Sequence, residues 1–319
     1  MNKIAVVIPA YKATFLNKAL ESLEAQTDQR FSTYIFDDGS RDNLREICDL
    51  YTDTLNLKYY RFTENLGNLS LPLHWNRCIE QTTEEWVWLF SDDDVASSKC
   101  IASFYDSELE DEKFSVLCFD SIVIDKNGTV IRINPPNPDT EFPIEYLYHR
   151  LMGDRFTYAP DHIFHRDAFD RCGGFRDLPL AWCADDIAWY EFSNQLPIKK
   201  LYGGKIYWRL SGCNLSSDLP YTRKKKQEGV FEFARWAIHH MGSGIISEHE
   251  IQKDMLDQAL ARWLLQQISS TCNYSEICNL SSRIMKIVVN VSVERVVFKL
   301  FAGVTMRRIN AVINKFLSI

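Results

Sequence analysis

The sequence has no run of about 18 uncharged apolar residues, the length that a membrane-spanning helix requires. Its 9 cysteines are scattered and form no C-x-x-C pair, so they fit reduced thiols in a cytoplasmic protein better than a disulfide framework or a zinc site. The start, Met1 to Pro9, lacks the small-residue cleavage site of a signal peptide. These absences predict a cytoplasmic protein that does not span a membrane.

No strong excess of basic charge is present either. Hydrophobic residues make up 46% of the chain and charged residues 25%, the balance of a globular protein rather than of a disordered or fibrous one. The net charge of −7 argues against general nucleic-acid binding, because phosphate neutralisation needs a basic face. We therefore expect no nucleic-acid partner.

The C-terminal stretch 283–319 departs from this acidic balance. It carries 7 Lys and Arg residues against the single acid Glu294, and it interleaves them with Ile, Val, Phe and Leu. Such a segment can lie on an anionic membrane surface with its apolar side down. It can equally be a helix that packs on the rest of the protein with a solvated basic face, and the sequence leaves both interpretations open.

Strand patterns alternate with helix patterns before residue 215. The β-branched run Ile4 to Ile8 is typical of a strand buried on both faces. Strands are predicted at 4–8, 33–36, 57–62, 86–90, 116–123, 129–133 and 205–210, helices at 16–23, 44–51, 75–81 and 185–195, and a proline-marked loop at 135–143. This order predicts an α/β domain, 1–215, with a mixed, mostly parallel, Rossmann-like sheet flanked by helices. The remainder, 216–319, is predicted to be a helical C-terminal extension.

Three carboxylates in succession, Asp92-Asp93-Asp94, follow the predicted strand 86–90. They would lie at the carboxyl end of that strand, where open α/β sheets bind their ligands. Adjacent ionised carboxylates repel one another, and a divalent cation such as Mn²⁺ or Mg²⁺ makes such a cluster favourable. A cap for the helix near Ser97 is the plainer alternative, but a cap needs only one acid. The run therefore favours a metal site.

A second acidic turn, Asp37-Asp38-Gly39-Ser40, ends the predicted strand 33–36. Because the carboxyl ends of parallel strands meet at one edge of a sheet, both acidic turns should face one crevice. A carboxylate there can accept a hydrogen bond from a ring N–H of a nucleobase. By itself the segment is better explained as an Asp-Gly turn that caps a helix. The pairing of two such turns is what favours a ligand site.

Seven short motifs follow one another in an order that resembles the family 2 glycosyltransferases, which have the GT-A fold. They are Ile4 to Tyr11, the helix Leu20 to Thr27, Asp37-Asp38-Gly39-Ser40, Glu64-Asn65-Leu66-Gly67 with Asn76, Ser91-Asp92-Asp93-Asp94, Gly173-Gly174-Phe175 and Asp185-Asp186. Each motif is weak alone, but seven in order make coincidence a poor explanation. The resemblance divides the first domain into a nucleotide-sugar half, about 1–95, and an acceptor half, about 96–215.

The resemblance implies roles at the matching positions. The donor-binding residues would be Pro9, Ala10, Tyr11, Asp38, Asn76, Asp92 and Asp94. Asp38 would recognise the base, and Asp93 would be the principal ligand of Mn²⁺ or Mg²⁺. Asp94 would be a further metal ligand beside the diphosphate, and Asp92 would lie near the ribose or the metal. Arg209, at the end of the last predicted strand, can pair bidentately with the donor's diphosphate, and a surface salt bridge is the alternative for it.

The pair Asp185-Asp186 stands where the family usually has Glu-Asp, which implies that one of these carboxylates is the general base, with Asp186 favoured. A positioned carboxylate can take the proton of an acceptor hydroxyl as that hydroxyl attacks the anomeric carbon, and direct displacement inverts the configuration. The leaving nucleoside diphosphate would be stabilised by the cation. The alternative is a place in the first turn of a helix, where acids suit the macrodipole.

These residues predict an inverting transfer of a sugar from a nucleotide-sugar donor, a UDP-sugar by preference, to a glycan or lipid-linked acceptor in cell-surface polysaccharide biosynthesis. A lipid-linked acceptor would place the protein on the inner face of the membrane through 283–319. A sugar nucleotidyltransferase is the enzymatic alternative, but it usually needs a glycine-rich loop after the first strand, and Pro9 to Ala13 has no glycine. A catalytically inactive nucleotide-sugar-binding protein is the other, and the intact Asp93 and Asp186 argue against it.

Overall fold

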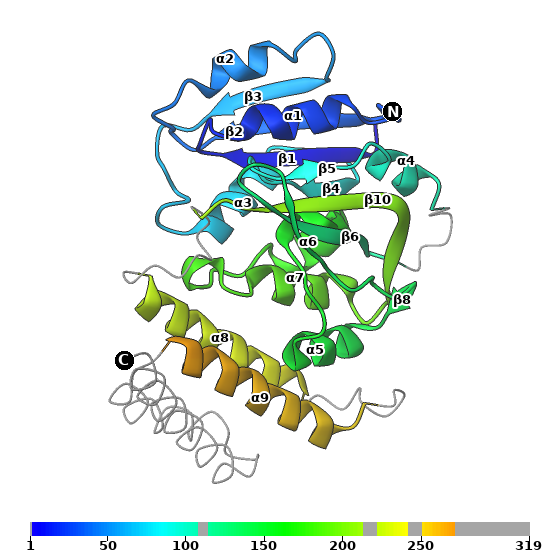
Figure 1. Cartoon of the computed structure of the whole chain (residues 1–319), viewed down its shortest axis with the longest axis vertical. Helices are drawn as coiled ribbons and strands as arrows, with labels where there is room; N and C mark the ends of the chain where they lie inside the picture. The colour runs from blue at the N-terminus through cyan, green and yellow to red at the C-terminus, as the bar shows by residue number, and fades with distance from the viewer. Residues whose placement is uncertain (1, 108–113, 213–221, 242–250, 272–319) are drawn as a thin grey trace, which may run out of the picture. The chain divides into compact units, whose positions relative to one another are not determined.

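The structure, a computed structural model, describes residues 2–107, 114–212, 222–241 and 251–271 (Figure 1). The chain divides into two compact units. The first is formed by 1–147 and 155–217, and the second by 148–154 and 218–319. Every strand of the described residues belongs to the first unit.

A ten-stranded mixed sheet is the centre of the first unit (Figure 1). Its order is β3-β2-β1-β4-β9-β6-β10-β5, with β7 paired to β6 and β8 paired to β10. The bounds are β1 Ile4–Ala10, β2 Phe31–Asp37, β3 Leu57–Arg61, β4 Trp86–Leu89, β5 Val95–Ala96, β6 Val116–Asp125, β7 Val130–Ile133, β8 Thr140–Glu141, β9 His162–His165 and β10 Ile198–Leu210. The predicted mixed α/β sheet is confirmed.

Parallel and antiparallel pairs occupy different parts of this sheet. Strands β1 to β4 pair in parallel, as do β6 and β10. The other 5 of the 9 described pairs are antiparallel, including both pairs made by β9. The expectation of a mostly parallel sheet therefore holds for β1 to β4 and for the pair of β6 and β10. Two of the antiparallel pairs come from β9, a short strand absent from the predicted set that runs between β4 and β6 in the opposite direction, and three come from the short strands β5, β7 and β8.

Helices cover both faces of the sheet, because each buried strand has apolar side chains on both. In β1, Ile4, Val6 and Ile8 enter one buried cluster, and Ala5 and Val7 enter the other. The first cluster includes side chains of α1 (Leu16–Glu24), α2 (Leu44–Asp49) and α4 (Cys100–Tyr105), and the second includes side chains of α3 (Leu71–Ile79), α6 (Arg166–Cys172) and α7 (Ala184–Ser193). This packing leaves the carboxyl ends of β1, β2 and β4 together at one edge.

Prolines mark the start of two helices that the sequence pattern placed wrongly. Helix α3 begins before the predicted position 75, because the Ser70 hydroxyl accepts a hydrogen bond from the N–H of Leu73 at 3.2 Å and Pro72 fits the first turn. Helix α5 (Pro143–Met152) begins at the end of the predicted loop, since proline in a first turn has no N–H to lose. Two 3₁₀ turns, η1 (Ala159–Asp161) and η2 (Pro179–Ala181), complete the unit.

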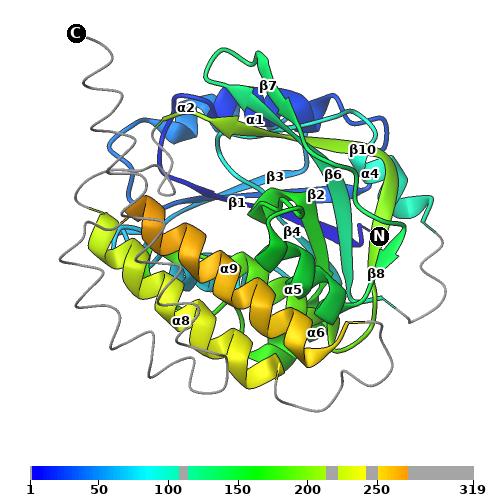
Figure 2. The same cartoon turned by 60° about the horizontal axis from the view of Figure 1, so that its bottom comes forward.

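The described part of the second unit consists mainly of α8 (Arg223–Met241) and α9 (Lys253–Thr271), and the predicted helical extension over 216–319 stays a prediction. The two helices lie side by side (Figure 2), and the rings of Phe233 and Trp263 are 4.9 Å apart between centroids. Over the four described stretches, no helix has both the length and the apolar character needed to cross a bilayer. The basic stretch 283–319 lies outside the described residues.

Candidate functional site

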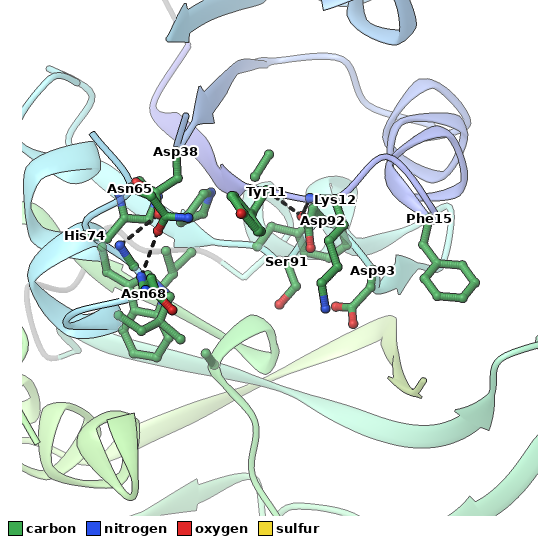
Figure 3. A pocket seen from close by; sticks show the side chains of 18 of the residues that line it. Tyr11, Lys12, Phe15, Asp38, Asn65, Asn68, His74, Ser91, Asp92 and Asp93 are labelled. Atoms are coloured by element: carbon green, nitrogen blue, oxygen red, sulfur yellow. Dashed lines mark hydrogen bonds and ion pairs between the residues drawn. The ribbon is translucent and has the colours of Figure 1, made fainter. Parts of the chain in front are cut away.

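A cavity of about 460 Å³ opens at the carboxyl ends of β1, β2 and β4 (Figure 3). Pro9 to Tyr11 line it from the end of β1, Asp38 from the turn after β2, and Asp92 and Asp93 from the loop after β4. Figure 3 shows Asp38 at one end and Asp93 at the other. The volume is that of a small-molecule site. Two acidic turns that lie far apart along the chain thus border one cavity from the same sheet edge.

Asp38 is buried at one end of the cavity and is held by three donors. Its Oδ1 accepts from the N–H of Leu66 at 2.9 Å and from Arg77, and its Oδ2 accepts from the N–H of Gly67 at 2.8 Å. Burial raises the pKa of Asp38, while these hydrogen bonds and the charge of Arg77 act in the opposite direction. The carboxylate is therefore fixed in orientation.

Arg77, which the sequence motifs did not single out, connects Asp38 to His74. Its Nε donates to His74 Nδ1 at 3.0 Å, and its guanidinium lies 3.8 Å from the ring centroid of Phe62. Burial, aided by the charge of Arg77, lowers the pKa of His74 to about 3, so the imidazole is neutral with its proton on Nε2. The 3.5 Å approach of His74 to Asp38 is consequently not an ion pair.

Asp37, at the end of β2, holds the shape of the same turn. Its Oδ2 accepts from the Tyr59 hydroxyl at 2.5 Å and from Arg61 Nη1 at 2.9 Å, and its Oδ1 accepts from the N–H of Ser40 at 2.7 Å. Arg61 also donates to the carbonyl oxygen of Ser40 at 2.6 Å. The hydrogen bonds of Asp37 and Arg61 thereby hold the turn that carries Asp38 in its shape.

At the other end of the cavity, Asp92 fixes the segment that follows β1. Its Oδ2 accepts from the N–H of Tyr11 at 2.9 Å and from the N–H of Lys12 at 3.2 Å. Burial raises the pKa of Asp92, against these hydrogen bonds. The side chain therefore shapes the cavity wall through the backbone of its neighbours.

Asp93 reaches into the cavity beside Lys12 (Figure 3). Burial and the negative charge of Asp92 raise the pKa of Asp93 to about 7, and the positive charges of Arg209 and Lys12 only partly oppose this. A carboxylate that is so reluctant to ionise beside other acids is stabilised by a bound cation.

Asp94 is buried behind Asp93. Its Oδ1 accepts from the N–H of Arg209 at 2.7 Å, whereas its Oδ2 has no hydrogen-bond partner among the described residues. Burial and the charge of Asp93 raise the pKa of Asp94 well above its ordinary value. A buried carboxylate oxygen without a donor is costly, so this position also has the character of a cation ligand.

The guanidinium of Arg209 is engaged behind the acidic loop. Its Nε donates to the carbonyl oxygen of Asp93 at 2.7 Å, and its Nη1 donates to the carbonyl oxygen of Asp125 at 3.1 Å. The side chain is buried, with the ring of Phe15 4.6 Å from its guanidinium carbon. These contacts fix the acidic loop, and the burial of the side chain does not match the alternative of a surface salt bridge. The expected pairing of Arg209 with the donor's diphosphate stays a prediction.

The family model described as "Glycosyl transferase family 2" matches residues 5–175. The chain belongs to that family. The matched range contains both acidic turns and the Gly173-Gly174-Phe175 motif, and it excludes Asp185, Asp186 and Arg209.

Relatives and solved structures of this family agree with the fold. An uncharacterized glycosyltransferase of Mycoplasma genitalium is 30% identical over 37% of this chain and 41% of its own length. A poly(ribitol-phosphate) beta-N-acetylglucosaminyltransferase of Staphylococcus aureus is 28% identical over 80% of this chain and 39% of its own. The chain therefore spans about two fifths of the length of these relatives.

Two solved structures share the GT-A fold. A fragment of the S. aureus enzyme in complex with UDP-GlcNAc has a TM-score of 0.66 and 20% identity, covering 92% of this chain and 82% of the fragment. A mannosyltransferase of Pyrobaculum calidifontis in complex with GDP-Man and Mn²⁺ has a TM-score of 0.54 and 12% identity, covering 95% of this chain and 87% of the other. The predicted family and GT-A fold are confirmed.

Within the family motifs, Asn76 is engaged by the backbone of Phe175. Its Nδ2 donates to the Phe175 carbonyl oxygen at 2.9 Å, and its Oδ1 accepts from the Phe175 N–H at 2.8 Å. A Cβ on Gly174 would lie 2.7 Å from Asn76 Oδ1, so the glycine allows this close approach. The contacts give Asn76 a part in positioning α3 against the Gly-Gly turn, and the donor contact implied by the resemblance stays a prediction.

The two acids of α7 have different surroundings. Asp186 is buried, and its Oδ1 accepts from the Tyr146 hydroxyl at 2.8 Å and from the Thr157 hydroxyl at 3.0 Å. Asp185 is half-buried, and its Oδ1 accepts from the N–H of Asp186 at 3.0 Å. Both acids lie in the first turn of α7, as the plainer interpretation expected, and Asp186 is in addition directed at two side-chain hydroxyls.

The residues of the acidic loop fit a hard divalent cation that other ligands complete. The described part of the chain contains no group of three or more His, Cys, Asp or Glu side chains that would hold a metal by themselves. Mg²⁺ at nucleotide sites takes one or two carboxylates and fills its shell with phosphate oxygens and water. Asp93 at the cavity and the unpartnered Oδ2 of Asp94 match that requirement.

Proposed function

We propose that the chain transfers a sugar, with inversion, from a nucleotide-sugar donor to a glycan or lipid-linked acceptor in cell-surface polysaccharide biosynthesis. The main observation behind this proposal is a cavity with acidic side chains at both ends. Asp38 lies at one end and is held by hydrogen bonds, and Asp92 and Asp93, whose negative charges repel each other, lie at the other. A nucleoside diphosphate has the matching polarity, with a base bearing N–H groups at one end and a diphosphate at the other. A UDP-sugar is favoured, since the solved S. aureus relative binds UDP-GlcNAc.

In this proposal Pro9, Ala10 and Tyr11 line the nucleoside's side of the cavity, and Asp38 accepts a hydrogen bond from the base. Asp93 and Asp94 hold Mn²⁺ or Mg²⁺, and Asp92 keeps the adjoining backbone in place. When bound, the cation acts as a Lewis acid on the leaving diphosphate.

Asp186 is the proposed general base. It takes the proton of the acceptor hydroxyl while the oxygen attacks the anomeric carbon from the face opposite the leaving group, so the configuration inverts. Its fixed Oδ1 supports this choice over Asp185, whose Oδ1 is used at the start of the helix.

The remainder of the proposal concerns regions and location. Residues of about 1–95 serve the donor and about 96–215 the acceptor, with 216–319 as a helical region on the cytoplasmic face of the membrane. The basic stretch 283–319 supports attachment to anionic lipid. Removing 283–319 should release the protein from anionic vesicles in a sedimentation assay, and unchanged sedimentation would contradict the attachment.

Two measurements test the catalytic part. UDP-, GDP- and dTDP-sugars are screened for thermal stabilisation with and without Mn²⁺, and we expect a cation-dependent rise in Tm with UDP-sugars; no stabilisation by any of them would contradict the proposal. Asp186→Asn should retain donor binding while turnover falls by about two to four powers of ten. Equal turnover would remove Asp186 from the base role, and the matched Asp185→Asn variant shows whether its neighbour carries it.

A further inference from the structure

Three elements of the first unit converge on the Asp186 carboxylate. Tyr146 comes from α5, Thr157 from the segment that follows α5, and Asp186 from the first turn of α7. The two hydroxyls both donate to Asp186 Oδ1, and their oxygens are 3.2 Å from each other. Tyr146 and Asp186 are almost completely buried, which makes this a closed polar cluster inside an apolar layer.

The segment in front of Asp186 makes such anchoring necessary. Leu180, Ala181 and Cys183 have φ values of 59°, 54° and 61°, the left-handed region that side-chain-bearing residues avoid. Strained backbone of this kind persists only where the surroundings fix it, and it gathers at functional sites. The hydrogen bonds on Asp186 are among the contacts that fix the start of α7 in spite of that strain.

We propose that Tyr146 and Thr157 are positioning residues for the general base, and that together they hold the Asp186 carboxylate ionised and in one orientation. This inference rests on the proposed role of Asp186. Hydrogen bonds donated to a carboxylate favour its charged form, which counteracts the preference for the neutral form that burial imposes.

Other titratable groups surround this cluster. They are Asp185 on α7, Tyr146 on α5, and His162 of β9, whose Nδ1 lies 2.6 Å from Asp161 Oδ1 and whose ring contacts that of Tyr146. The hydroxyls of Tyr146 and Thr157 both donate to Asp186, so their removal reports on Asp186 itself.

The test uses Tyr146→Phe and Thr157→Val, with Thr157→Ser as the conservative variant that restores the hydroxyl. Tyr51→Phe is the matched control, since it removes another buried tyrosine hydroxyl, one that donates to Asn17 at 2.9 Å. The full chain is labelled with ¹³C at the aspartate carboxyl carbons, and Asp186→Asn identifies the signal of Asp186. Release of UDP from UDP-GlcNAc with water as acceptor gives kcat across the pH range.

We expect the titration midpoint of the Asp186 signal, and the acid limb of kcat, to move upward by about one pH unit in each single variant. Thr157→Ser and Tyr51→Phe should leave both in place. An unmoved Asp186 signal in both Tyr146→Phe and Thr157→Val would overturn the inference while the base assignment stands. A moved signal without any loss of turnover in Asp186→Asn would instead overturn the base assignment, and the inference with it. If one variant does not fold, the other still decides the result.

Discussion

The two acidic turns that border the cavity differ in how their charges are satisfied. At the Asp37-Asp38 turn, each carboxylate accepts hydrogen bonds from at least two donors, and an arginine accompanies each one. At the Asp92 to Asp94 loop, the carboxylates raise one another's pKa and one buried oxygen has no partner among the described residues. The first turn is satisfied by donors of the protein itself, whereas the second keeps repulsion between carboxylates that the proposed cation would relieve.

The largest effect is expected in the Asp92 to Asp94 loop, the incomplete turn, when Asp93 at the cavity is replaced. Asp93→Asn should weaken cation-dependent binding of UDP by at least about a hundredfold in calorimetry, because a carboxylate ligand is removed. Asp28→Asn, on the surface and paired with Arg30, is the matched control. An unchanged affinity in Asp93→Asn would show that the Asp92 to Asp94 loop, like the Asp37-Asp38 turn, does not depend on a cation.

A substitution beside the Asp37-Asp38 turn should show its effect in the free energy of unfolding of the protein. Arg77→Met leaves buried Asp38 without its cation, and we expect a loss of about 3 kcal/mol in the free energy of unfolding at pH 7. Burial already raises the pKa of Asp38, and losing Arg77 raises it further. Because ionising such a group costs stability, the loss should shrink as the pH falls. Urea denaturation at pH 7 and pH 5 measures this, with the exposed pair variant Arg45→Met as a control that changes little.

A smaller change tests whether the Asp37-Asp38 turn is shaped for its ligand. A Cβ on Gly67 would lie 2.6 Å from Asp38 Oδ2, so Gly67→Ala should displace that carboxylate. We expect UDP binding to weaken by about tenfold, the usual result of overpacking, and by the same factor with and without Mn²⁺. A loss seen only with Mn²⁺ would mean that the two ends of the cavity do not act separately. Leu69→Ala, an exposed neighbour, serves as the control.

The last prediction is a pH trend at the incomplete turn. Folding raises the pKa of Asp93 from 3.8 to about 7, so the cation-free protein should lose stability as the pH rises through that window and level off above it. Asp93→Asn should flatten the trend in urea denaturation. A cation together with UDP should flatten it too, because the bound charge favours the ionised carboxylate.

The sequence predicted the placement of these turns but not their internal contacts. Asp38 and Asp93 could be assigned to one cavity because parallel strands such as β2 and β4 end at the same sheet edge. Arg77 carried one available signal, a basic residue one position after Asn76 on the same helix. Its bond to Asp38 depends on how the loop 62–70 folds back, which no periodicity encodes.

The contacts of Asp186 were harder to predict from the sequence than the contacts of the two acidic turns. Tyr146 lies on a helix that proline composition made look like a loop, and Thr157 lies in an irregular segment. Their contacts with Asp186 join positions 40 and 29 residues apart. Residue type and spacing could identify the acid pair, but they could not say which member is buried or which hydroxyls meet it.

The contact between Arg209 and Asp94 joins residues 115 positions apart, and it has a consequence for the newly made protein. A ribosome delivers β1 to β4 and the three adjacent aspartates long before the strand that supports them. Domains fold as units during synthesis. A nascent chain that ends before β10 should therefore carry an open acidic loop and fail to retain UDP and Mn²⁺, and the growing protein would acquire its nucleotide affinity only when the last strand has left the ribosome.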